Sequence, residues 1–202
     1  MEAKVIAILR GVEPEKLPDL VEALLAGGIR AVEVTLNSTS PLEQIRTVVR
    51  VAGGRALVGA GTVLDESAAA AAIMAGAEFL LAPNVNEGVI RTAHRYGKPV
   101  LPGAMTPTEI AVAVEAGADI VKVFPAATLG PRYFKEVKNP LDHVVLMATG
   151  GISAENAREF LQAGADLIGV GGKLVDRQLL AADRLDEITR RAAELVRTVR
   201  PG

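Results

Sequence analysis

The chain has 202 residues, of which 50% are hydrophobic, and its 22 basic and 24 acidic side chains give a formal net charge of −2. This length and apolar content suit a single domain, residues 1–202, built on one large core. The charge balance offers no basic surface to nucleic acid, no apolar run is long enough to predict a membrane helix, and the lack of cysteine excludes disulfides and thiolate chemistry. With no signal or lipidation motif in the sequence, we expect a cytoplasmic protein without a membrane partner.

Eight apolar runs predict β-strands that alternate with helices along the chain. They cover residues 5–9, 30–36, 56–59, 78–82, 99–101, 119–124, 144–148 and 166–170. Prolines suited to a first helical turn and residues that cap helices predict helix starts at Pro14, Pro41, Asp65, Asn86, Pro107, Pro131 and Ser153. Several helical stretches end in an Ala-Gly pair, the usual chemistry of a helix carboxyl terminus.

Continuous apolar strands that alternate with helices indicate a parallel sheet covered by helices on its outer face. Eight such units in about 200 residues fit a (β/α)8 TIM barrel better than a doubly wound sheet, which usually has fewer strands. We therefore predict a single-domain α/β barrel. Its chemistry would lie at the carboxyl ends of the strands.

Lys122 interrupts an apolar strand, in the run Asp-Ile-Val-Lys-Val-Phe-Pro at 119–125. Burial disfavours the ammonium form, and the neutral amine that results is a nucleophile for carbonyl carbon. The alternative is a strand-end lysine whose amine reaches solvent. Glu33, inside the second strand, needs a cation or a role in proton transfer if it faces inward. A structural ion pair between Glu33 and Lys122 is the other interpretation of these two residues.

Further polar or aromatic residues stand near strand ends, where they would surround the same mouth. They are Arg10, Thr35, Thr62, Pro83, Phe124 and Thr149. Side-chain alternation places Thr35 on the same side as Glu33, and Phe124 on the same side as Lys122. We therefore treat these residues as candidates for substrate binding.

Two glycine turns follow the last two predicted strands, Thr-Gly-Gly at 149–151 and Gly-Val-Gly-Gly at 169–172. Each precedes a helix, so backbone amides could converge there on an anion. Barrels often bind phosphate after their seventh and eighth strands. Glycine is also common in tight turns that bind nothing, so both interpretations stay open.

Six motifs occur in a fixed order: Leu-Arg-Gly (9–11), Glu-Val-Thr-Leu (33–36), Gly-Ala-Gly-Thr-Val-Leu (59–64), Pro-Gly-Ala-Met-Thr-Pro-Thr-Glu (102–109), Lys-Val-Phe-Pro-Ala (122–126) and Thr-Gly-Gly-Ile (149–152). Together, over residues 5–175, they resemble the 2-keto-3-deoxy-6-phosphogluconate (KDPG) aldolases, which also cleave 4-hydroxy-2-oxoglutarate (KHG). The resemblance implies a class I aldolase, a carbon–carbon lyase that needs no metal and no cofactor. It also implies a small 2-keto acid substrate, pyruvate and glyceraldehyde 3-phosphate as products, and a homotrimer.

The resemblance also assigns expected roles. Lys122 would form a Schiff base, and Glu33 would be the general acid and base. The residues implied in binding are Arg10, Thr62, Pro83 and Phe124 in the substrate pocket, and Gly150, Gly151, Gly171 and Gly172 in the phosphate turns. Thr35 and Thr149 join the first group as strand-end candidates, and Lys173 joins the second because it follows the last turn.

The chain departs from the family pattern at three places. Asn37 stands where some members have an arginine for the substrate carboxylate, so that role would pass to Arg10, Thr62 or backbone amides. Gly172 replaces a common serine, and the following Lys173 could compensate for the lost hydroxyl. The sequence enters its first strand almost at once, so we expect residues 1–4 or a neighbouring subunit to close the far end of the barrel.

Two alternatives from other classes share the predicted fold. A ribulose-phosphate type of epimerase or decarboxylase would use the same glycine turns but normally needs histidines or metal ligands at strand ends. The chain has only His94 and His143, in unrelated elements, which argues against that class and against a histidine-rich metal site. A non-catalytic barrel that binds a phosphorylated ligand is the second alternative. An aldolase for the galactonate epimer of the substrate remains open within the family.

Overall fold

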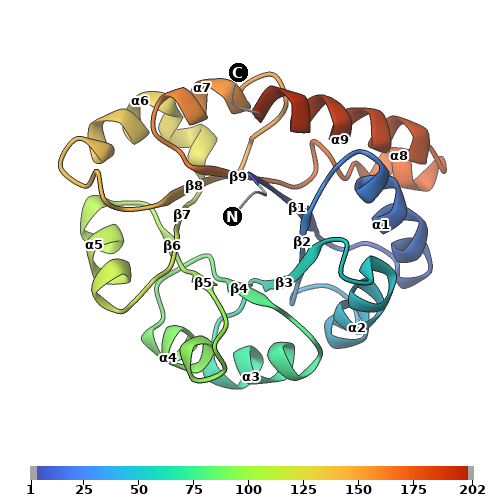
Figure 1. The fold of residues 1–202 in the computed structure, drawn as a ribbon, viewed down its shortest axis with the longest axis horizontal. Coiled ribbons are helices and arrows are strands. Elements are labelled where there is room, and N and C mark those ends of the chain that lie inside the picture. Colours follow the sequence, from blue (N-terminus) through green and yellow to red (C-terminus); the bar gives the residue numbers. More distant parts are fainter. Residues whose placement is uncertain (1–3, 200–202) are drawn as a thin grey trace.

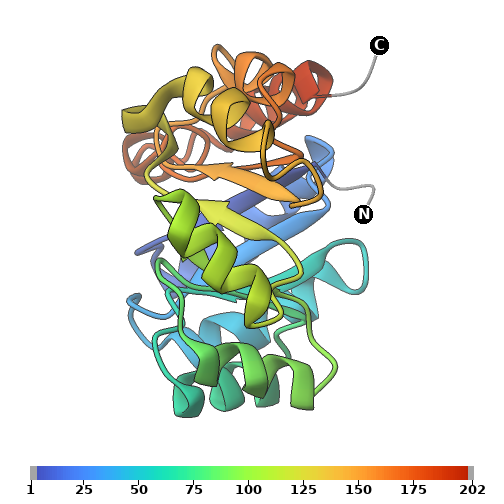
Figure 2. The same cartoon turned by 90° about the vertical axis from the view of Figure 1, so that its left-hand side faces the viewer.

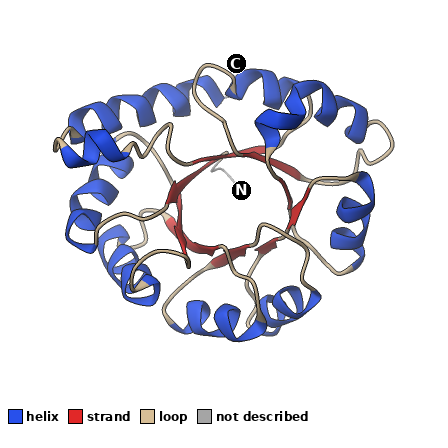
Figure 3. Cartoon of the chain, turned by 180° about the vertical axis from the view of Figure 1, so that it is seen from behind, coloured by secondary structure: helices blue, strands red, loops and turns tan. Residues whose placement is uncertain are grey.

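The computed structural model describes residues 4–199. Its strands are β1 (Val5–Leu9), β2 (Ala31–Thr35), β3 (Leu57–Gly61), β4 (Phe79–Leu81), β5 (Val100–Leu101), β6 (Gly103–Ala104), β7 (Val121–Val123), β8 (Leu146–Thr149) and β9 (Leu167–Val170). They form one parallel sheet in the order β5-β4-β3-β2-β1-β9-β8-β7-β6. The sheet curves into a ring inside a ring of helices (Figures 1 and 3). The predicted (β/α)8 barrel is confirmed.

Nine strands replace the predicted eight because Pro102 divides the fifth one. β5 pairs with β4 and β6 pairs with β7, so the two short strands together fill one position of the barrel. Proline has no N–H to donate to a ladder. Its carbonyl still accepts the Lys122 N–H at 2.9 Å, which keeps this part of the chain against β7.

The helical elements are η1 (Pro14–Lys16), α1 (Leu17–Ala26), α2 (Pro41–Ala52), α3 (Glu66–Met74), α4 (Glu87–Arg95), α5 (Pro107–Glu115), α6 (Ala126–Lys138), α7 (Ala157–Gln162), α8 (Arg177–Ala181) and α9 (Leu185–Val199). They cover the outer face of the sheet, as the side view of α5 shows (Figure 2). No helix among residues 4–199 is long and apolar enough to cross a membrane.

Most predicted helix starts are confirmed, and two are wrong. Helix α6 begins at Ala126, and Pro131 opens only its second part, after Gly130 breaks the helix with a φ of 77°. Helix α7 begins at Ala157 rather than near Ser153. The amide of Asn156 donates to the Gly151 carbonyl at 3.0 Å, and its side-chain oxygen accepts the Ser153 N–H at 2.9 Å, so these residues form a turn.

Side-chain alternation along the strands creates two cores. Outward residues such as Val32 and Val34 pack under the helices in the larger core. The inward apolar residues form a second cluster inside the barrel: Ile6, Ala31, Phe79, Leu81, Leu101, Ile120, Met147 and Leu167. In β2 the inward positions after Ala31 are Glu33 and Thr35, so along this strand polar side chains replace the apolar cluster toward the carboxyl end.

The expected closure of the far end by residues 1–4 concerns a segment that is mostly outside the described residues, which start at Lys4. Lys4 itself is exposed, and its carbonyl accepts the Ile168 N–H at 2.9 Å, which extends the pairing of β1 with β9.

Candidate active site

Glu33 and Lys122 are the two buried ionisable side chains of the barrel lumen, with exposed fractions of 0% and 4%. They project from β2 and β7, which are four strands apart in the sheet order. Neither carboxylate oxygen of Glu33 has a hydrogen-bond partner among the described residues. The amine of Lys122 therefore does not reach solvent, and the carboxylate of Glu33 is not tied up in a bonded ion pair.

The pKa values of both groups are shifted toward their neutral forms. Burial raises the pKa of Glu33, and the positive charges of Lys122 and Arg10 oppose that shift only in part. Burial lowers the pKa of Lys122; Glu33 opposes this shift, whereas Arg10 adds to it. A neutral amine is a nucleophile and a protonated carboxyl is a proton donor, so the pair has the chemistry that carbonyl addition requires.

Gly61 makes room for the Glu33 carboxylate. A Cβ at Gly61 would lie 1.6 Å from Glu33 Oε1, so no other residue fits there while Glu33 keeps its place. Gly61 pairs with Thr35 at the end of β3, directly beside the lumen. Our sequence reasoning did not select Gly61 as a site residue, although glycines two positions apart at 59 and 61 signal close approach on one face of a strand.

Phe124 and Thr149 line the side of the lumen next to Lys122. The amine nitrogen of Lys122 lies 5.4 Å from the centroid of the Phe124 ring, which gives the amine an apolar neighbour. Thr149 is buried, and its hydroxyl has no partner among the described residues. A Cβ at Gly169 would come within 2.6 Å of that hydroxyl oxygen, so the glycine leaves space for it. Thr149 thus presents an unused hydrogen-bonding group.

The hydroxyl of Thr35, unlike that of Thr149, has hydrogen-bond partners within the protein. It lies 3.4 Å from the Leu9 carbonyl and 3.1 Å from the Ser38 hydroxyl, and Ser38 Oγ accepts the Gly11 N–H at 3.0 Å. These contacts join the ends of β1 and β2. Ser38 was not singled out from the sequence, since its role depends on a loop that returns to the preceding strand.

The ends of β3 and β4 place Thr62 and Pro83 on adjacent strands at the mouth. Thr62 has a φ of 58°, a left-handed conformation that non-glycine residues seldom adopt outside functional sites and tight turns. Pro83 lies so close to Gly103 that a Cβ there would be 2.4 Å from the Pro83 carbonyl oxygen. Arg10 is exposed at the end of β1, and its charge acts on both Glu33 and Lys122.

The two glycine turns follow β8 and β9, which pair through Thr149 and Gly169, so they are neighbours at the carboxyl end of the barrel. Gly150 and Gly151 have φ values of 97° and 75°, which other residues adopt only with strain. Within residues 4–199, the backbone amides of Gly150, Gly151, Gly172 and Lys173 donate to no protein acceptor. The turns therefore place backbone N–H donors on adjacent strands, a suitable arrangement for an oxyanion.

The remaining residues singled out from the sequence lie outside the lumen. Lys173 and Asn37 are exposed, and Gly171 directly follows β9 as part of the second glycine turn. His94 and His143 are far from the lumen, in contacts with Asp119 and Asp142. No group of three or more potential metal ligands of the His, Cys, Asp or Glu type occurs in the part of the chain that the structure describes.

Comparison with known proteins gives a consistent result. Residues 1–191 match the family model described as KDPG and KHG aldolase. The 2-dehydro-3-deoxy-6-phosphogalactonate aldolase of Escherichia coli K12 is 37% identical over 96% of this chain and 94% of its own. The KHG/KDPG aldolase of the same organism is 35% identical over 88% and 83%.

One solved structure of similar fold contains a covalent intermediate. The KDPG aldolase of Legionella pneumophila, with pyruvate captured as a covalent carbinolamine intermediate, superimposes with a TM-score of 0.89 at 26% identity, covering 96% of this chain and 94% of that one. The match to the family model spans nearly the whole chain, and the relatives agree with it. The chain therefore belongs to the KDPG and KHG aldolase family.

Proposed function

We propose that this protein is a class I aldolase that cleaves KDPG to pyruvate and glyceraldehyde 3-phosphate, and KHG to pyruvate and glyoxylate. The observation that carries the proposal is the burial of Lys122, at 4% exposure, in the same lumen as a Glu33 carboxylate that has no hydrogen-bond partner within residues 4–199. Burial supplies the neutral amine that attack on a ketone needs. The covalent pyruvate adduct in the Legionella pneumophila relative supports the same chemistry for this family member.

In the first stage the Lys122 amine adds to the C2 ketone of the substrate to form a carbinolamine. Protonated Glu33 donates a proton to the leaving hydroxyl, water departs, and a protonated imine remains on Lys122. The new positive charge then favours the ionised form of Glu33, because an opposite charge nearby lowers the pKa of a carboxyl. The same residue is thus ready to act as a base.

In the second stage the Glu33 carboxylate removes the proton of the C4 hydroxyl. The C3–C4 bond breaks, its electron pair enters the imine, and the aldehyde leaves while an enamine stays on Lys122. The enamine takes a proton at C3, and water hydrolyses the resulting imine to release pyruvate and the free amine. The unused hydroxyl of Thr149 and the guanidinium of Arg10 are the groups we assign to the pyruvate carboxylate.

The phosphate of KDPG would bind at the turns formed by Gly150 with Gly151 and by Gly171 with Gly172. Their free amides and the cation of Lys173 favour an oxyanion there. Phosphate is remote from the breaking bond, so its binding energy would also help to orient the reacting carbons. The phosphorylated substrate is therefore expected to be turned over faster than KHG.

The galactonate epimer of KDPG is a second candidate substrate. It is favoured by the Escherichia coli relative named as a 2-dehydro-3-deoxy-6-phosphogalactonate aldolase, at 37% identity over 96% of this chain. The two substrates differ at C4, the carbon whose hydroxyl proton Glu33 removes. Discrimination would therefore arise at the mouth of the lumen, near Thr62 and Pro83.

A direct test measures pyruvate release from KDPG, its galactonate epimer and KHG, with inorganic phosphate as competitor. Phosphate should inhibit cleavage of the two phosphorylated substrates, and Lys173→Ala should raise their KM while leaving KHG cleavage nearly unchanged. Equal effects of Lys173→Ala on all three would reject a phosphate-specific role for that side chain. Absence of pyruvate from every substrate would reject the aldolase assignment in favour of a ligand-binding barrel.

A further inference from the structure

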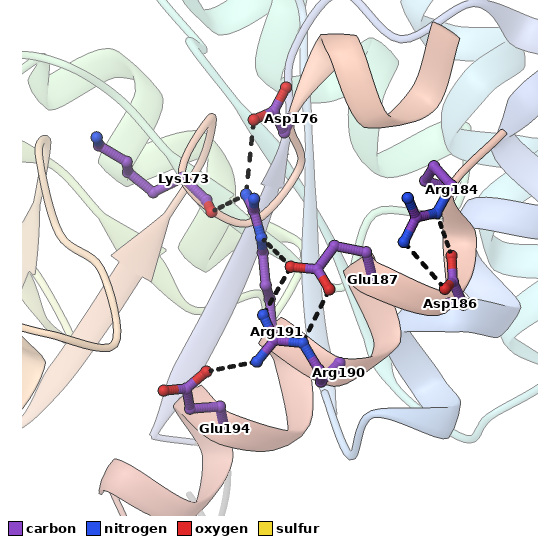
Figure 4. Close-up of polar contacts among 8 residues, drawn as sticks. All are labelled: Lys173, Asp176, Arg184, Asp186, Glu187, Arg190, Arg191 and Glu194. Carbon is purple, nitrogen blue, oxygen red and sulfur yellow. Dashed lines mark hydrogen bonds and ion pairs between the residues drawn. The ribbon is translucent and has the colours of Figure 1, made fainter. Parts of the chain in front are cut away.

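Arg191 connects helix α9 to the segment 171–176, which carries the second glycine turn. Its Nη1 donates to the Lys173 carbonyl at 3.3 Å and lies 3.5 Å from Asp176 Oδ2 (Figure 4). The Nε of the same guanidinium donates to Glu187 Oε1 at 3.1 Å. One half-buried cation therefore contacts the segment at Lys173 and at Asp176, and it is itself held by a carboxylate on its own helix.

Arg191 binds the carbonyl of a peptide group whose N–H is also hydrogen-bonded. That peptide joins Lys173 to Leu174, and the Leu174 N–H donates to the Gly171 carbonyl at 2.9 Å. With its carbonyl bound by Arg191 and its N–H bound by Gly171, the peptide plane cannot rotate without breaking a hydrogen bond. The preceding amides, of Gly172 and Lys173, are those that have no acceptor among the described residues.

Asp176 extends the same arrangement toward α8. Its Oδ1 accepts the Gln178 N–H at 2.8 Å, and its Oδ2 faces Arg191. The side chain of Lys173 extends away from Arg191 and Asp176, so it does not compete for these contacts (Figure 4). Arg191 and Asp176 thus hold the segment without using the amides of Gly172 and Lys173 or the amine of Lys173, which can bind an anion.

We propose that Arg191 is a positioning residue for the phosphate of the substrate. It fixes the Lys173 carbonyl so that the amides of Gly172 and Lys173 keep one orientation toward the anion. The inference rests on the proposed phosphate site and assigns a role to a residue that touches neither substrate nor the reacting atoms. Donors that are ordered before the ligand binds lose less entropy on binding. Loss of the contacts made by Arg191 should therefore weaken binding of phosphorylated substrates more than binding of KHG.

Arg190 provides a matched control on the same helix. It donates to both oxygens of Glu187, at 2.8 and 2.7 Å, and to Glu194 at 3.4 Å. Within the described residues it has no bond to the segment 171–176. Replacing Arg190 or Arg191 with alanine removes the same charge from the same helix; Arg190→Ala loses two hydrogen bonds to Glu187 and Arg191→Ala loses one. Only Arg191→Ala releases the segment.

The experiment compares Arg191→Ala with Arg190→Ala, using KDPG or its epimer, whichever the wild type prefers, and KHG. For Arg191→Ala we expect the KM of the phosphorylated substrate and the inhibition constant of inorganic phosphate to rise about three- to tenfold, the effect of losing a partly exposed charge-assisted hydrogen bond. Its kinetics with KHG should stay within about twofold of the wild type, and Arg190→Ala should change neither substrate by more than that. Asp176→Asn, which keeps an acceptor for Gln178, should shift phosphate binding in the same direction.

Equal losses on both substrates in Arg191→Ala, or equal behaviour of the two arginine variants, would overturn the proposal, because either result indicates general destabilisation. If Arg191→Ala does not fold, a wild-type response to phosphate in Asp176→Asn overturns it. A wild-type enzyme that phosphate does not inhibit contradicts the phosphate site of the proposed function first, and the role of Arg191 with it. The wild-type measurement alone therefore separates the two failures.

Discussion

Gly61→Ala tests whether the position of the Glu33 carboxylate controls catalysis. The added Cβ would lie 1.6 Å from Glu33 Oε1, 2.3 Å from Cδ and 2.7 Å from Cγ. To regain an ordinary contact of 3.4 Å, the nearest oxygen must move by about 1.8 Å. A displacement of this size takes the carboxyl out of hydrogen-bonding reach of the atom that it serves. We expect kcat to fall by about 10²-fold, the loss that a 1 Å misplacement produces in oriented reactions.

Pyruvate release from KHG and from the preferred phosphorylated substrate gives kcat, and a thermal melt of each variant shows whether the barrel is intact. Overpacking of this kind costs about 1–3 kcal/mol, which leaves a stable domain able to fold. The control is a double-mutant cycle with Glu33→Ala, in which Gly61→Ala should add little to the loss because the clashing carboxylate is gone. A folded Gly61→Ala enzyme with kcat within about threefold of the wild type would refute the role of Glu33 placement.

Three further predictions concern the proton, the amine and the assembly. Glu33→Gln keeps the shape of the side chain but cannot take up or release a proton, so kcat should fall by about 10²–10⁴-fold, and near-normal turnover would identify another base. Burial lowers the pKa of Lys122 in the fold from 10.5, so in the pH range between the folded pKa and 10.5 the unfolded chain binds more protons, and there the stability of the wild type rises with pH. The melting temperature of Lys122→Met should therefore exceed that of the wild type by more at pH 6 than at pH 9, and a constant difference would contradict the lowered pKa. Light scattering at micromolar concentration should give a homotrimer, as the family resemblance implies and as exposed apolar residues such as Leu64 (51%) and Met74 (67%) favour; a monomer would exclude it.

The barrel could be predicted from the sequence because its signals are local. Apolar runs and helix caps recur with a period of one βα unit, and Asp65, Asn86 and Thr106 bind the first helical amides as residues of their type do. The errors arose where a tertiary contact decides between competing signals. Asn156 binds the backbone of the preceding turn, so helix α7 begins later than predicted. The fifth strand is divided at Pro102 because β5 pairs with β4 whereas β6 pairs with β7.

The candidate site divides in the same way. Glu33 and Lys122 are detectable because ionisable residues in apolar strands contradict the pattern around them. Three contacts depend on distances between segments far apart in the chain. They are the space that Gly61 leaves for Glu33, the hydrogen bonds of Ser38, and the contacts of Arg191 with the segment 171–176. A single sequence contains no record of such distances, so these residues required the structure.

Reductive trapping tests the central claim most directly. Pyruvate and sodium borohydride are added to the wild-type protein and to Lys122→Ala, and the modified peptide is identified by mass spectrometry. If Lys122 forms the Schiff base, borohydride reduces the imine to a stable secondary amine on that residue and on none of the other six lysines. Lys122→Ala should remain unlabelled. Labelling of another lysine in the wild type, or labelling that persists in Lys122→Ala, would contradict the mechanism.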